Sequence, residues 1–235
     1  MSTVTEVNKE GSIWLQRYGA IALLVMPLCY ICMFMIFGVA LSIPQTDMLN
    51  DKIAYVAANQ GIISAAYISG YLIFGCMLLV AVQAIHHSLA KTSSHLLQSA
   101  SAFGLIWVVL MMCSSMIALV GMNTMVTLHA QNPLDSQTLF YVYTTIVNAL
   151  GGGIELVGGL WVLLLSLCGL LHKQLPKSLS LFGVMVGLLG ILTVYQAIPE
   201  FKEAFGLTQI VWFVWMGIVL MPKRQQVQSN DLNDP

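Results

Sequence analysis

Six long apolar stretches without a lysine or arginine constrain this chain more than any other feature. The hydrocarbon core of a bilayer is about 30 Å thick, and a helix needs about 20 apolar residues to cross it. The fourth stretch is longer than one crossing requires, so it must tilt or project beyond the membrane. The six stretches run from Tyr18 to Ile43, Ile62 to Ile85, Ala102 to Leu128, Leu139 to Leu171, Leu179 to Ile198 and Phe205 to Leu220.

Composition excludes several classes of protein. Of the 235 residues, 58% are hydrophobic and 8% are charged, whereas soluble domains carry about 25% charged residues. A soluble globular fold and a disordered chain are therefore excluded. The 9 basic and 10 acidic residues also leave no positive field that would attract a nucleic acid.

The fold class follows from the chemistry of the backbone in lipid. Helices satisfy their own hydrogen bonds there, and the alternating pattern of a β-barrel is absent. We therefore expect an all-α, polytopic bundle of six transmembrane helices that forms one domain over residues 18–221. Residues 1–17 are expected to be a cytoplasmic tail, and residues 222–235 a disordered cytoplasmic tail. The first span begins late and is long, so we expect it to be retained rather than cleaved as a signal peptide.

Orientation follows from the lysines and arginines outside the spans. Two of them, Lys52 and Lys202, fall on one side of the predicted membrane, and the other seven fall on the opposite side. Because positive residues stay in the cytoplasm, both termini are expected there. The seven are Lys9, Arg17, Lys91, Lys173, Lys177, Lys223 and Arg224.

Glu155 is the residue that most suggests a function. It lies midway along the fourth stretch and is the only charged residue deep inside any of the six. A charge at the bilayer centre costs about 2.5 kcal/mol or more, so such residues usually face a bundle interior or a wet cavity. A carboxyl group at this depth can couple to proton movement, or bind a cation or an amine.

Several polar side chains are predicted to accompany Glu155. In a continuous helix Tyr141, Thr144 and Asn148 share its face. Other polar residues are expected at a similar outer depth, namely Asn123 on the third span and Tyr195 and Gln196 on the fifth. We therefore expect an outward-opening polar pocket with Glu155 at its floor. In the alternative interpretation Glu155 only holds helices together through a hydrogen bond.

Glycines predict close helix packing. Gly183 and Gly187 form a Gly-x-x-x-Gly motif on the fifth span, and Gly151 and Gly159 flank Glu155 on the fourth. Packing is the favoured interpretation of both sets. The glycines around Glu155 could instead interrupt the fourth helix, a feature that marks the binding sites of transporters.

Cysteines and histidines give weaker signals. Cys29 and Cys32 form a Cys-x-x-Cys in an apolar span, where no basic neighbour favours a thiolate, so packing is preferred over a redox role. His86 and His172 end the second and fourth spans on the same side, a pairing that leaves a haem role open. We expect no bound cofactor, no metal site and no catalytic residue.

One segment resembles a known family. It contains Glu155, Leu160-Trp161, the loop Leu175-Pro176-Lys177 and a helix rich in glycine from Gly183 to Gly190. This pattern resembles a family of bacterial six-helix integral membrane proteins that is catalogued as a domain of unknown function. The resemblance covers about a fifth of the chain by its motifs. It implies a bacterial inner-membrane location and adds no reaction.

The sequence thus predicts a multi-pass protein of the bacterial inner membrane. It would bind a small ligand or cation near Glu155, for transport or for sensing. The alternative is a non-catalytic membrane subunit or assembly partner. The common hydrolase and metalloprotease motifs are absent, so an enzyme is less favoured. Beyond the lipid bilayer no partner is indicated, nucleic acid is not expected, and a homo-oligomer or a partner protein in the membrane stays open.

Overall fold

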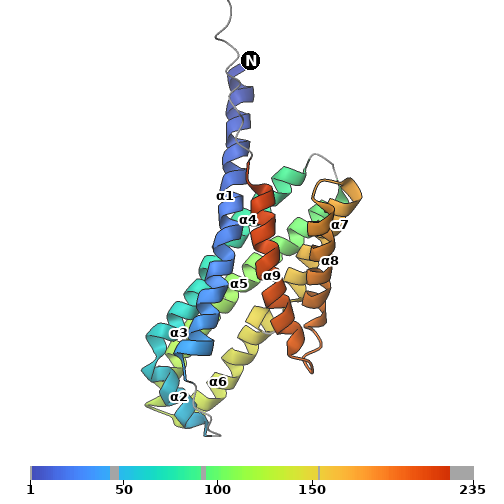
Figure 1. Ribbon diagram of the computed structural model, residues 1–235. Coiled ribbons are helices and arrows are strands. Elements are labelled where there is room, and N and C mark those ends of the chain that lie inside the picture. Colours follow the sequence, from blue (N-terminus) through green and yellow to red (C-terminus); the bar gives the residue numbers. More distant parts are fainter. Residues whose placement is uncertain (1, 43–47, 91–93, 153, 223–235) are drawn as a thin grey trace, which may run out of the picture.

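The computed structural model describes residues 2–42, 48–90, 94–152 and 154–222, with the side chains of residues 2–10 and 152 excepted. Every regular element in this part of the chain is helical (Figure 1). The elements are α1 (Ser2–Met35), η1 (Ile36–Ala40), α2 (Leu49–Ala58), α3 (Gln60–Tyr67), η2 (Ile68–Ile73), α4 (Phe74–Leu89), α5 (His95–His129), α6 (Pro133–Val147), η3 (Asn148–Gly152), α7 (Leu156–His172), α8 (Lys177–Leu192) and α9 (Glu200–Leu220), where η marks π-helical turns.

The predicted all-α class is confirmed, and five of the helical stretches are long and apolar enough to cross a membrane. They run over Gly11–Ala40, Gln60–Leu89, His95–His129, Pro133–His172 and Glu200–Leu220. The stretch expected from Leu179 to Ile198 is the shorter helix α8 of 16 residues, which is about 24 Å long. The predicted C-terminal tail lies outside the described residues, apart from Pro222.

Two hydrophobic clusters divide the molecule. The larger is built from α1, α4, α5, α7, α8 and α9, and the smaller from η1, α2, α3, α6 and the end of α5. In Figure 1, α7, α8 and α9 stand beside the upper part of the bundle, while α2 and α6 lie at its lower end. We call the part formed by α2, α3, α6 and the end of α5 the lower lobe.

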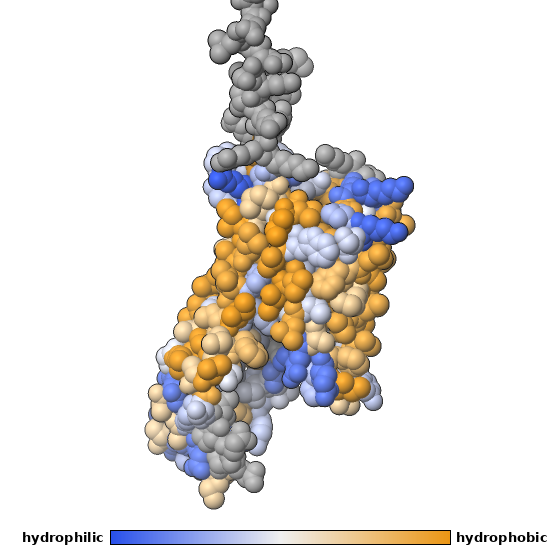
Figure 2. Space-filling model, viewed as in Figure 1, coloured by the Kyte–Doolittle hydropathy of each residue, from blue (hydrophilic) through white to orange (hydrophobic). Residues whose placement is uncertain are grey.

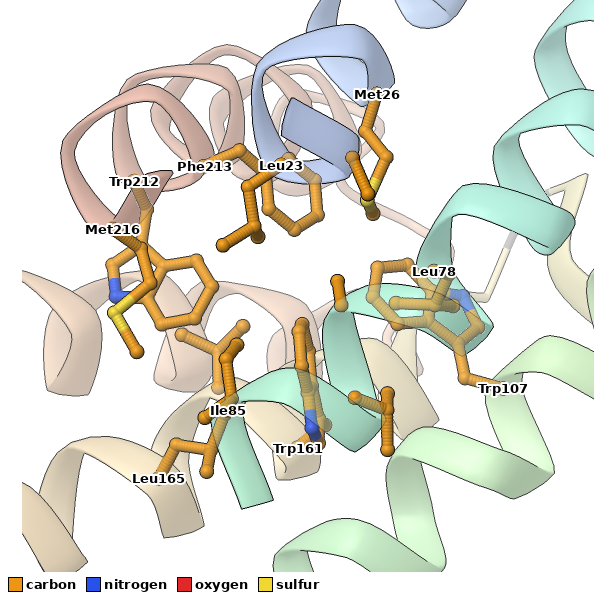
Figure 3. Packing of buried hydrophobic residues seen from close by; sticks show 14 of the residues in the cluster. Leu23, Met26, Leu78, Ile85, Trp107, Trp161, Leu165, Trp212, Phe213 and Met216 are labelled. Atoms are coloured by element: carbon orange, nitrogen blue, oxygen red, sulfur yellow. The ribbon is translucent and has the colours of Figure 1, made fainter. Parts of the chain in front are cut away.

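Aromatic rings fill the centre of the larger cluster. Trp161 lies between Trp107 and Trp212, with ring centroids 5.8 and 5.6 Å away (Figure 3). Phe213 packs at 5.8 Å from Trp212 and 6.4 Å from Trp107. These rings come from α5, α7 and α9, so they tie three helices together at one depth.

Small residues let α7 and α8 approach closely. A Cβ built on Gly159 would lie 2.8 Å from the backbone of Gly187 and of Gly190. A Cβ on Gly183 would meet the Ser166 hydroxyl and would lie 2.6 Å from Nε1 of Trp212. The two backbones therefore touch, as the glycine motifs of membrane helices permit.

The outer surface is strongly apolar. Figure 2 shows hydrophobic residues over most of α1, α8 and α9, with hydrophilic residues gathered at the turn between α7 and α8 and at the start of α9. Individual side chains are largely exposed, including Phe34 at 67%, Leu207 at 69% and Ile218 at 63%. An apolar surface of this extent is what lipid covers in a membrane protein.

We predict that Gly159→Ala destabilises the protein by about 1–3 kcal/mol, because a methyl group has no space between the backbones of α7 and α8. Thermal unfolding of the purified protein in detergent measures the effect. Gly61→Ala is the matched control, since a Cβ there meets no atom within 4 Å and α3 gains a better helix former. Equal melting temperatures for the two variants would contradict the packing described above.

Candidate functional site

The fourth span is broken at Glu155. Gly151 has φ 157° and ψ 3°, a conformation that L side chains rarely adopt, and α7 begins only at Leu156. Glu155 itself is the N-cap of α7, with φ −100° and ψ 23°. The prediction of one continuous helix from Leu139 to Leu171 is therefore wrong. The alternative interpretation of these glycines, that they interrupt the fourth helix, agrees with the structure.

A hydrogen bond to the end of α8 fixes the position of Glu155. Its backbone N–H donates to Oγ1 of Thr193 at 2.8 Å, and that hydroxyl donates to the carbonyl of Gly190 at 2.7 Å. Glu155 is 7% exposed and Thr193 is 3% exposed, so this link is shielded from solvent. The break is thus held by one buried side chain of a neighbouring helix.

The carboxyl group of Glu155 lies within electrostatic range of side chains from three other elements. Its charge acts on the hydroxyl groups of Tyr30 in α1 and Tyr71 in η2, and the ammonium of Lys202 in α9 acts on it. In the part of the chain that the structure describes, the hydrogen bonds of Glu155 are made by its backbone. These are the N–H that donates to Thr193 and the carbonyl that accepts from the N–H of Gly159.

Irregular helical turns surround this position. Tyr71 lies in the π-helical turn η2, and η3 contains Gly151, where the break begins. Both turns contact α5, and η2 also contacts α1. Turns of this kind leave carbonyl groups outside the regular hydrogen-bond pattern and occur often at functional sites.

Glu155 lies close to the ends of neighbouring helices. It lies 17 residues before His172, the last residue of α7, which corresponds to about 26 Å along the helix axis. Thr193, its partner, is the C-cap of α8, and Lys202 is in the first turn of α9. The backbone of Glu155 is therefore level with the C-terminal end of α8, and its carboxyl group lies near the start of α9. Within the long stretch Pro133–His172 it still falls near the middle.

The polar stripe predicted on the fourth span is not continuous. The break changes the helical register, so Tyr141, Thr144 and Asn148 do not share a face with Glu155. Tyr141 and Asn148 are exposed, and the Thr144 hydroxyl donates to the carbonyl of Phe140 at 2.6 Å. Tyr141 and Thr144 belong to α6, in the lower lobe, and Asn148 begins η3.

The other predicted residues lie on the surface. Asn123 on α5 accepts a hydrogen bond from Nε2 of Gln60 at 3.2 Å, at an exposed position. Tyr195 and Gln196 are exposed in the turn between α8 and α9, just beyond Thr193. A cavity of about 160 Å³ lies at the opposite end of the bundle, between α1, α4, α9 and the turn after α7.

Sequence reasoning missed four residues of the site, Tyr30, Tyr71, Thr193 and Lys202. The sequence could have pointed to Lys202, because it is one of only two basic residues predicted on the outer side of the membrane. The two tyrosines are polar residues inside apolar spans, a weaker signal. Thr193 gave none, because its role depends on how α8 packs against the break.

The cysteines and histidines show no cluster. Cys29 is buried and Cys32 is exposed, and both are free thiols. His86 and His87 contact the hydroxyl groups of Ser101 and Ser12 at 2.6 and 2.9 Å. Within the described residues no group of three or more His, Cys, Asp or Glu side chains could hold a metal ion.

Comparison of the chain with protein-family models, curated proteins and solved structures finds no match. The interpretation of this site therefore depends on its geometry.

We predict that Thr193→Val destabilises the protein by about 1–3 kcal/mol, because it leaves the buried N–H of Glu155 without an acceptor. Thr193→Ser keeps the hydroxyl and is expected to retain most of the stability. Thr208→Val is the matched control, since its hydroxyl bonds only to carbonyls of its own helix. Thermal unfolding in detergent compares the three, and a Thr193→Val protein as stable as Thr193→Ser would show that the link does not hold the break.

Proposed function

We propose that this chain is a bacterial inner-membrane protein that binds a small ligand or cation at Glu155 from the outer side, for transport or sensing. The observation that carries the proposal is the buried carboxyl group at a helix break. Interrupted helices of this kind form the binding sites of many transporters. Tyr30 and Tyr71 would orient the ligand, and Lys202 would balance the charge of the empty site.

We further propose six spans with both termini in the cytoplasm. The turn after α7 and the turn after α8 reverse the chain, so α8 would supply the sixth crossing between α7 and α9. The distribution of charge supports this orientation. Arg17, Lys173 and Lys177 lie at one end of the bundle, whereas Lys52 of α2 and Lys202 of α9 are the basic residues described at the other.

The alternative, in which Glu155 only joins helices, requires the carboxyl group itself to bridge them. The bridge to α8 is made by the backbone N–H instead. Replacing the side chain would therefore leave this link intact. This is why we prefer a binding role to a structural one.

We predict that Glu155→Gln abolishes a pH-dependent carboxyl signal while the fold is retained, because the amide keeps the shape of the side chain and cannot ionise. Infrared difference spectra between acid and alkaline pH, recorded for the wild type and the variant, measure the signal with the proton as the probe. Thermal unfolding provides the control for folding, and Glu203→Gln is the matched variant at an exposed acid of the same end.

Two outcomes would contradict the binding proposal. One is a set of identical difference spectra for the wild type and Glu155→Gln, which would show that the carboxyl group does not exchange protons. The other is a loss of stability in Glu155→Leu and Glu155→Gln alike, which would assign the residue to the scaffold.

The proposed topology predicts the activity of fused reporters. A fluorescent protein that folds only in the cytoplasm should fluoresce when it follows Pro222 or Lys173, because both positions are placed inside. Alkaline phosphatase, which needs the periplasm, should be active after Gln131 or Ala197. Fluorescence of the fusion after Ala197 would show that α8 does not cross the membrane.

A further inference from the structure

Buried polar atoms without partners lie between Glu155 and the cavity at the other end of the bundle. Within the described residues, Nε2 of Gln209, Nε1 of Trp212 and Oγ of Ser180 have no hydrogen-bond partner. Their side chains are 5%, 1% and 0% exposed, respectively. Buried polar atoms nearly always have a partner in folded proteins, so each of these requires an explanation.

Two of these atoms, those of Gln209 and Trp212, lie one turn apart on the inner face of α9, whereas Ser180 belongs to α8. Taking Gln209 as the reference, Lys202 lies about 20° away around the helix, and Gly206 and Trp212 lie about 60° away on opposite sides. The Tyr30 hydroxyl lies beside Gly206, since a Cβ built on Gly206 would be 2.9 Å from the hydroxyl oxygen. Polar groups therefore occur at the levels of residues 202, 206, 209 and 212.

On the side toward the cavity, the neighbouring polar groups come from α7 and α8, and α9 itself contributes Met216. A Cβ on Gly183 would contact both the Ser166 hydroxyl and Nε1 of Trp212, so these groups share one level. Ser180 lies one turn further along α8, 2.8 Å from a Cβ built on Gly169. Met216, one turn beyond Trp212, lines the cavity together with Gln16 and Ser88.

The spacing fits water. Successive levels on α9 are three or four residues apart, or about 4.5–6 Å along the axis. One water molecule bridges two polar atoms about 5.6 Å apart, since each of its hydrogen bonds is about 2.8 Å long. A bridging water also needs two or more polar partners, and each of the levels 202, 206, 209 and 212 carries at least one polar group.

From this arrangement we propose that the inner face of α9 carries a file of water molecules that conducts protons between Glu155 and the cavity at the opposite end. This inference deepens the proposed function and rests on it, because it takes the proton as the ligand of Glu155. The neutral carboxyl group gives its proton to the first water, the excess proton passes along the file, and the carboxylate regains a proton from the outer side. Gln209, Trp212 and Ser180 hold the waters and exchange no proton themselves.

Among the described residues, the titratable groups that interact electrostatically with Glu155 at the start of the file are Tyr30 of α1, Tyr71 of η2 and Lys202 of α9. Beyond that level the path is lined by uncharged groups. Proton movement along it therefore depends on water and on Glu155 as the entry group.

The test is proton flux into vesicles that contain the purified full-length protein, driven by a potassium diffusion potential and followed with an internal pH dye. We expect flux above that of protein-free vesicles. Gln209→Leu should reduce the protein-dependent flux by at least about tenfold, the factor that corresponds to one lost hydrogen bond of ordinary strength. Trp212→Phe, which removes only Nε1 from the ring system, should reduce it by a smaller factor and serves as the second variant if Gln209→Leu fails to fold.

Thr208→Val is the control, because it neighbours Gln209 and its hydroxyl bonds to Ala204 and Phe205 of its own helix. Its flux should equal that of the wild type. Wild-type flux in both Gln209→Leu and Trp212→Phe would overturn the path, as would a wild type without flux whose Glu155 carboxyl group still titrates in infrared spectra. A Glu155 that does not titrate would overturn the proposed function itself.

Discussion

The link between Glu155 and Thr193 is the interaction on which the rest of the structure depends. A helix interrupted inside a membrane protein exposes backbone groups that lipid cannot satisfy. Here the N–H freed by the break reaches a hydroxyl at the end of α8, and that hydroxyl reaches the carbonyl of Gly190. The same glycine packs against Gly159 of α7. The break and the tight contact between α7 and α8 therefore stabilise each other.

The break also separates two parts of the molecule. Below it, α6 forms part of the lower lobe, and above it α7 packs with α8 and α9 around the aromatic cluster (Figure 1). Glu155 lies at this boundary, where helix ends from α7, α8 and α9 meet. A carboxyl group in such a place is shielded by protein and is still close to one end of the bundle, which suits a site that exchanges ligand with one side.

The polar groups of α9 connect this boundary with the opposite end. Gln209 and Trp212 have buried donors without partners in the described part of the chain, and they lie in the direction of the cavity. A purely structural role for Glu155 does not explain why these buried donors lack hydrogen-bond partners. A binding site with a water-filled path behind it explains both, so the site and the path form one hypothesis about proton movement.

The sequence by itself determined the helical class, the approximate limits of the apolar stretches and the special status of Glu155. These follow from hydropathy and from the cost of one charge among apolar residues, which act locally along the chain. It could not determine the side-chain neighbours of Glu155, because the register of a helix is lost at a break such as Gly151. The stripe of Tyr141, Thr144 and Asn148 was therefore wrong. Only the tertiary structure decided that Tyr30, Tyr71, Thr193 and Lys202 surround the acid, since these residues come from four separate elements that packing alone brings together.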